Sequence, residues 1–186
     1  MKDQKQFLAQ IIHTLHKANI PYMISGSVGS SFHGQPRATN DADIVIAPTV
    51  EQIISFIELL GPDFYVSKEA AKQAIENKTM FNIIDIQAGY KTDLIVRKQR
   101  PFSQQEFTRR TPVDFFGIET WFVTPEDSIL SKLEWSKDRR SETQFNDALG
   151  VLMAQKDNLD YEYLKKWAKE LGVDDALQNL LKEANL

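Results

Sequence analysis

Asp41-Ala42-Asp43-Ile44-Val45-Ile46 is the stretch on which the predicted fold depends. Its β-branched second half is typical of a buried strand. Residues i and i+2 of a strand point to the same face, with Cα atoms roughly 6–7 Å apart, so both aspartates project together. Carboxylates about 4 Å apart repel by about 4 kcal/mol at an effective dielectric constant near 20, and a hard divalent cation reverses that sign. The pair predicts a cation site. When the pair is considered alone, the alternative to a cation site is a solvated strand end.

A glycine–serine turn precedes this strand. Residues 22–25 form a short strand candidate that leads directly into Gly26-Ser27, and residues 28–33 can make one or two helical turns. Glycine adopts backbone conformations that other residues resist, and a helix that starts here favours an anion through its free N–H groups. Gly26 and Ser27 are therefore candidates for binding a phosphate. Ordinary turn chemistry explains the same dipeptide.

A third acid belongs to a second apolar strand. Asp93 interrupts Lys91-Thr92-Asp93-Leu94-Ile95-Val96, where a charge costs free energy unless it is paired or bound to a metal. Asp85, within Ile83-Ile84-Asp85-Ile86, competes for the same role. The alternation of apolar and polar residues does not show whether Asp85 or Asp93 is the third acid.

The remaining pattern predicts a mixed α/β (α+β) core followed by helices alone. Within the core, Gly89-Tyr90 is expected to turn between two strands, and Gly117 to bend a strand or hairpin over 113–123. We expect a core at 1–124 and a helical C-terminal subdomain at 125–186. The expected helices are 4–18, 50–60, 68–76, 125–138, 142–155, 160–171 and 174–184, and the other expected strands are 43–47, 64–66, 81–87 and 92–96.

Composition limits the function classes. The 186 residues contain no cysteine, which excludes disulfides, thiolate zinc sites and cysteine nucleophiles. The formal net charge of −4 excludes a global positive field that would gather nucleic acid, although a local cluster such as Lys137, Arg139 and Arg140 could attract phosphate. With no signal-like start and no apolar run of bilayer length, we expect a cytoplasmic protein without membrane contact.

The order of these elements resembles the signature of the nucleotidyltransferase superfamily. Ile24-Ser25-Gly26-Ser27, a gap of about a dozen residues, Asp41-Ala42-Asp43-Ile44 and then Asp93 carry the resemblance, which covers residues 24–96. The wider stretch 34–43, with Thr124-Pro125-Glu126-Asp127 and Lys132-Leu133, is similar to the bacterial AbiEii-type branch. Aminoglycoside and lincosamide adenylyltransferases share the signature.

The resemblance implies a nucleotidyltransferase-like mixed sheet flanked by helices, with a C-terminal helical extension. It also implies Mg²⁺ (or Mn²⁺) and transfer of an NMP from a nucleoside triphosphate such as ATP to a hydroxyl, with release of pyrophosphate. Asp41, Asp43 and Asp93 would be the catalytic metal ligands, with Asp93 helping to deprotonate the acceptor. Gly26 and Ser27 would hold the phosphates of the donor.

Two further cations are candidates for donor binding. Arg37 lies four residues before the acid pair, where it is a phosphate contact or a surface arginine. Lys132 and Asp147 fall where AbiEii-type proteins carry a lysine and an aspartate, and an ordinary helix surface is the alternative. The acceptor is a small molecule, a tRNA or a protein. A non-catalytic nucleotide-binding module or toxin–antitoxin partner, with an antitoxin-like protein bound, is the competing function.

Overall fold

The computed structural model describes residues 3–37, 39, 41–139 and 141–186, the side chains of residues 138 and 139 excepted. These residues form two compact units. The sheet unit comprises residues 1–25 and 39–122, and the helical unit comprises residues 26–38 and 123–186. The helical unit thus takes in residues 26–38, which we had expected in the core. The division at residue 124 stays a prediction.

The sheet unit is built on a mixed sheet of seven strands among the residues described, in the order β3-β4-β5-β2-β1-β7-β6. The neighbours β2 and β5 are parallel, as are β1 and β7, and the other neighbouring pairs are antiparallel. The strands are β1 (Tyr22–Ser25), β2 (Asp41–Ile46), β3 (Phe64–Tyr65), β4 (Met80–Asp85), β5 (Lys91–Val96), β6 (Thr111–Phe115) and β7 (Ile118–Phe122).

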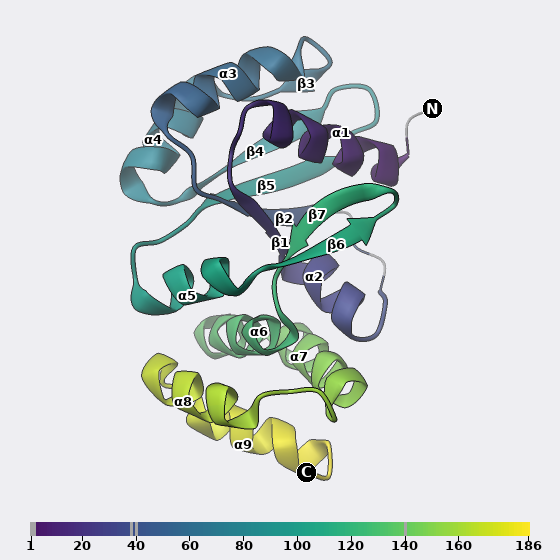
Figure 1. Cartoon of the computed structure of the whole chain (residues 1–186), viewed down its shortest axis with the longest axis vertical. Helices are drawn as coiled ribbons and strands as arrows, with labels where there is room; N and C mark the ends of the chain where they lie inside the picture. Colours follow the sequence, from purple (N-terminus) through teal and green to yellow (C-terminus); the bar gives the residue numbers. More distant parts are fainter. Residues whose placement is uncertain (1–2, 38, 40, 140) are drawn as a thin grey trace. The chain divides into compact units, whose positions relative to one another are not determined.

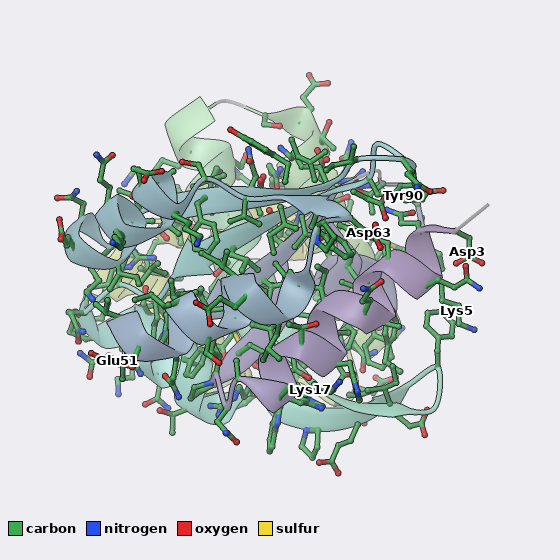
Figure 2. All side chains as sticks on the ribbon, turned by 90° about the horizontal axis from the view of Figure 1, so that it is seen from above. Asp3, Lys5, Lys17, Glu51, Asp63 and Tyr90 are labelled. Atoms are coloured by element: carbon green, nitrogen blue, oxygen red, sulfur yellow. The ribbon has the colours of Figure 1, made fainter. Side chains whose placement is uncertain are left out.

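Helices cover one face of this sheet and bury its apolar side chains. Figure 1 shows α1 (Gln4–Lys17), α3 (Val50–Leu60) and α4 (Lys68–Asn77) over the sheet. Ala42, Ile44 and Ile46 are the buried alternate residues of β2 and leave its other face to the two acids. The helices begin at side-chain caps, since Asp3 and Thr49 form capping boxes with Gln6 and Gln52. Figure 2 shows Asp3 and Lys5 at the start of α1 and Lys17 at its end.

Both predicted turns of the core are confirmed. The turn between β4 and β5 contains Gly89 with φ +72°, and β6 and β7 form a hairpin in which Gly117 has φ +79°. The sequence pattern did not predict α5 (Pro101–Arg109), whose start carries Pro101 at the first helical position. Its polar, weakly periodic sequence gives little apolar signal, although proline at this position is a recognised helix start.

The helical unit confirms the predicted C-terminal helices. It contains α2 (Gly26–His33), α6 (Pro125–Arg139), α7 (Glu142–Gln155), α8 (Tyr161–Leu171) and α9 (Asp174–Glu183). The expected start of α6 is confirmed by Thr124, whose hydroxyl donates to Asp127 Oδ2 at 2.7 Å and accepts from the Asp127 N–H at 3.3 Å. Among the described residues, no helix combines the length and apolar character needed to cross a bilayer.

Gly34 lets the chain after α2 approach α7 closely. A Cβ atom on Gly34 would lie 2.7 Å from the Val151 nitrogen and 2.8 Å from the carbonyl carbon of Gly150. These neighbours are backbone atoms of a helix and cannot move aside as a flexible side chain does. The close approach therefore requires the absence of a side chain at this position.

We predict that Gly34→Ala lowers the free energy of unfolding by about 1–3 kcal/mol, because the added methyl group overpacks this contact. Gly150→Ala is the matched control, since its Cβ would meet Gln35 atoms no closer than 3.6 Å. Alanine is favoured over glycine within a helix by about 1 kcal/mol, so the control should be neutral or stabilising. Urea unfolding measures both variants. Equal effects of the two substitutions would show that the close approach is absent.

Candidate functional site

The parallel pairing of β2 with β5 brings three acids to one face of the sheet. Asp43 lies directly opposite Asp93, and Asp41 lies opposite Lys91. Paired residues of neighbouring strands point to the same face about 4.8 Å apart, and residues i and i+2 share a face. Asp41, Asp43, Lys91 and Asp93 therefore project together, and we call these four residues the acid cluster. The register thus places Asp93 on the same face as the two acids of β2.

Asp93 is the most buried member of the acid cluster. It is 7% exposed, whereas Asp43 is half-buried and Asp41 is exposed. Its Oδ2 lies 3.2 Å from Lys91 Nζ, while its Oδ1 is buried with no hydrogen-bond partner in the described part of the chain. An unsatisfied buried carboxylate oxygen costs roughly 1–3 kcal/mol or more. Such an atom in a native site calls for a partner, and a cation is the partner that suits a carboxylate.

Lys91 neutralises part of the negative charge of the acid cluster. The hydrogen bond to Asp93 raises the pKa of Lys91; burial opposes this effect, and the charges of Asp93, Asp41 and Asp43 reinforce it. The lysine is thus attracted by all three acids at once. The sequence analysis missed Lys91, although its position two residues before Asp93 on the same strand places both side chains on one face.

Oxygen- and nitrogen-bearing side chains continue the row of the acid cluster across the sheet. Ser25 of β1 pairs with Asp43, and Asn82 of β4 pairs with Asp93. The row Ser25, Asp43, Asp93 and Asn82 therefore runs across four adjacent strands on one face. The sequence alone assigned neither flanking residue a place beside the acids, because strand order is needed to see that they are neighbours.

Asp85, the competitor of Asp93, points to the opposite face of the sheet. Asn82 is the β4 residue opposite Asp93, and Asp85, three residues further along, has the other parity. Its Oδ1 accepts hydrogen bonds from the backbone N–H groups of Gln87 at 3.0 Å and Ala88 at 2.9 Å. Asp85 therefore stabilises the β4–β5 turn, and the geometry leaves Asp93 as the third acid of the face.

The acid cluster has suitable ligands for a divalent cation, but its side chains are not gathered around one point. Among the described residues, no group of three or more His, Cys, Asp or Glu side chains is arranged to hold a metal ion. Asp93 Oδ2 is instead paired with the ammonium group of Lys91. The residue types and the unpartnered Asp93 Oδ1 nevertheless fit a hard cation with oxygen ligands.

A second charged group lies in the helical unit around Asp147 of α7. Arg37 binds both oxygens of this carboxylate, with Nε–Oδ1 at 2.9 Å and Nη2–Oδ2 at 3.1 Å. Lys132 Nζ of α6 lies 2.8 Å from Asp147 Oδ2. The side chains of Lys132 and Asp147 are 6% and 9% exposed, so the pair is buried and the alternative of an exposed helix lysine does not hold. Two cations on one carboxylate leave this group with a net positive charge.

Ser27 connects the Asp147 group to the start of α2. The Arg37 guanidinium donates to Ser27 Oγ at 2.5 Å. Gly26, the first residue of α2, has φ +59°, which confirms that this turn uses the conformational freedom of glycine. Ser27, Arg37 and Lys132 are therefore brought together by Asp147. Arg140 of the predicted basic cluster, and the side chain of Arg139, lie outside the described residues.

The fold of the chain is similar to that of solved structures, while no family model and no curated protein matches its sequence. An antigenic nucleotidyltransferase-like protein from Paracoccidioides brasiliensis superposes with a TM-score of 0.65 at 18% identity, over 96% of this chain and 87% of that one. The chain has a nucleotidyltransferase-like fold. The predicted fold class and the resemblance to nucleotidyltransferases are thereby confirmed. Similarity to the AbiEii-type branch stays a prediction.

Two structures of the antibiotic-resistance factor ANT(2'')-Ia share this fold. Its solution structure has a TM-score of 0.59 at 12% identity and covers 98% of this chain and 95% of that one. Its crystal structure in complex with adenylyl-2''-tobramycin has a TM-score of 0.58 at 12% identity and covers 90% and 96%. At these identities the likeness concerns the fold alone.

We predict that Asp147→Asn lowers the free energy of unfolding at pH 7 by roughly 3 kcal/mol, because it leaves buried Lys132 without its carboxylate. Burial raises the pKa of Asp147, but the hydrogen bonds from Arg37 and Lys132 outweigh it and lower the pKa overall. A lowered folded-state pKa gives stability that is complete above the unfolded pKa of about 3.9 and is lost as the pH falls below it.

The difference in the free energy of unfolding between wild type and Asp147→Asn should therefore become smaller below about pH 4. Urea unfolding at pH 7, 5 and 3.5 measures it. Asp157→Asn, which changes an exposed aspartate of the same unit, is the control and should show little effect. A difference that stays constant down to pH 3.5 would contradict the role of the ionised carboxylate.

Proposed function

We propose that the protein transfers a nucleoside monophosphate from a nucleoside triphosphate to a hydroxyl group and releases pyrophosphate. The observation that carries this proposal is the set of three carboxylates in the acid cluster, which lie on one face of β2 and β5, one of them with a buried oxygen that has no partner among the described residues. The nucleotidyltransferase-like fold supports it. Fold alone does not determine function, so the proposal depends on the chemistry of the acids.

Asp41, Asp43 and Asp93 would hold Mg²⁺ or Mn²⁺, which both prefer oxygen ligands. When bound, such an ion neutralises charge on the phosphates of the donor. In the transfer itself, the acceptor oxygen forms a bond to the α-phosphorus, and the bond from that phosphorus to the bridging oxygen of pyrophosphate breaks. We propose that the Asp93 carboxylate accepts the proton of the acceptor hydroxyl.

Donor binding is proposed for four residues of the helical unit. Gly26 and Ser27 would offer a backbone N–H and a hydroxyl to the phosphates, and Arg37 and Lys132 would offer positive charge. Asp147 would act as a positioning residue, since it binds both cations. Arg37 donates a hydrogen bond to Ser27, and this bond restricts the orientation of its guanidinium group.

For the acceptor, we propose a small cationic compound with free hydroxyl groups. The net charge of −4 and the isoelectric point near 5.4 favour a cation over a polyanion such as tRNA. The fold neighbour ANT(2'')-Ia, solved with adenylyl-2''-tobramycin, supports the same class.

A non-catalytic nucleotide-binding module is the second candidate function. The ion pair of Lys91 with Asp93 favours it, because an internal cation already satisfies one oxygen of the third acid. Such a module would bind a triphosphate without requiring a metal ion. The two candidates therefore differ in the metal dependence of triphosphate binding.

We predict that Asp41→Asn and Asp43→Asn each lower nucleotidyl transfer by at least a hundredfold and abolish metal-dependent triphosphate binding, with the fold retained. The assay incubates the protein with each labelled triphosphate, Mg²⁺ and a panel of aminoglycosides, and follows labelled product and pyrophosphate. Calorimetry with and without Mg²⁺ measures binding.

Asp63→Asn is the matched control, because Asp63 is an exposed aspartate of the same unit, labelled in Figure 2. It should behave as wild type in both assays. Triphosphate binding that needs no metal and survives Asp43→Asn would contradict the transferase and support the binding module.

A further inference from the structure

Lys91 places a permanent positive charge among the three acids. Its ammonium nitrogen lies 3.2 Å from Asp93 Oδ2, and Asp41 occupies the paired position on β2. The lysine side chain is 36% exposed, whereas that of Asp93 is 11% exposed. The ammonium therefore approaches the buried acid from the solvent side, on a stem long enough to move away again.

When no metal is bound, a cation in the acid cluster reduces the repulsion between its three carboxylates. Without Lys91, three carboxylates would share one face of two neighbouring strands, and like charges at this spacing repel each other. With Lys91, one oxygen of Asp93 is paired and the other stays without a partner within the described chain. A divalent ion bound to Asp93 would repel the ammonium, so both cannot occupy this carboxylate favourably.

We infer that Lys91 is a positioning residue that substitutes for the divalent cation at Asp93 in the metal-free protein and leaves Asp93 when the metal binds. This inference rests on the proposed function, because it assumes that the acids bind a metal. It explains why the described acids are not gathered around one point although they share a face: the ammonium group directs Asp93 toward itself. Lys91 thereby sets the metal affinity of the site.

The test compares Lys91→Met with wild type in the full chain. Methionine keeps most of the side-chain length and removes the charge. In EDTA, thermal unfolding of Lys91→Met should begin at a lower temperature than that of wild type, because the acids lose their internal cation. The dissociation constant for Mn²⁺, measured by electron paramagnetic resonance, should be about three- to tenfold lower than in wild type, as expected for the loss of one partly exposed competing charge.

Two further variants control this test. Lys91→Arg keeps the charge and should stay close to wild type in both measurements. Lys98→Met removes the charge of an exposed lysine just beyond the same strand and should change neither. A stability effect without a change in Mn²⁺ affinity would mean that Lys91 has only a structural role.

The outcomes separate this inference from the proposed function. If wild type binds Mn²⁺, Asp43→Asn does not, and Lys91→Met binds no more tightly than wild type, the inference is wrong and the metal site stands. If wild type and Lys91→Met both fail to bind Mn²⁺, the proposed metal site fails and the inference fails with it. Tighter binding in Lys91→Met alone supports the inference.

Discussion

The parallel pairing of β2 with β5 is the constraint on which the candidate site depends. Asp43 and Asp93 are 50 positions apart in the sequence and become lateral neighbours only through this register. A shift of one residue would turn one of the acids toward the buried face, where Ile44 and Leu94 lie. The apolar residues between the acids therefore fix the register, and the register fixes the spacing of the charges.

The acid cluster of the sheet unit and the charged group around Asp147 carry excess charge of opposite sign. In the sheet unit, three carboxylates share one face with a single ammonium group, which pairs with one oxygen of Asp93, and the other oxygen of Asp93 remains unpartnered in the described structure. In the helical unit, two cations surround the carboxylate of Asp147. Excess negative charge suits a metal ion, and excess positive charge suits a phosphate.

Much of the fold was predicted from patterns among residues that are close together in the sequence. The cap at Thr124, the turns at Gly89 and Gly117 and the apolar strands that contain Asp43 and Asp93 all depend on neighbours in sequence, and the structure confirms them. The choice of Asp93 over Asp85 required strand register, because both acids interrupt apolar strands. Lys132 shows the same limit: a helix pattern could not reveal that the lysine is buried against Asp147, which lies 15 residues further along on another helix.

The proposed function requires that Asp41, Asp43 and Asp93 form one metal site. A crystal grown with Mn²⁺, with diffraction collected at the manganese absorption edge, tests it most directly. We expect an anomalous peak in contact with carboxylate oxygens of all three residues, with the Lys91 ammonium moved away from Asp93. Manganese bound elsewhere, with the Lys91–Asp93 ion pair unchanged, would contradict it.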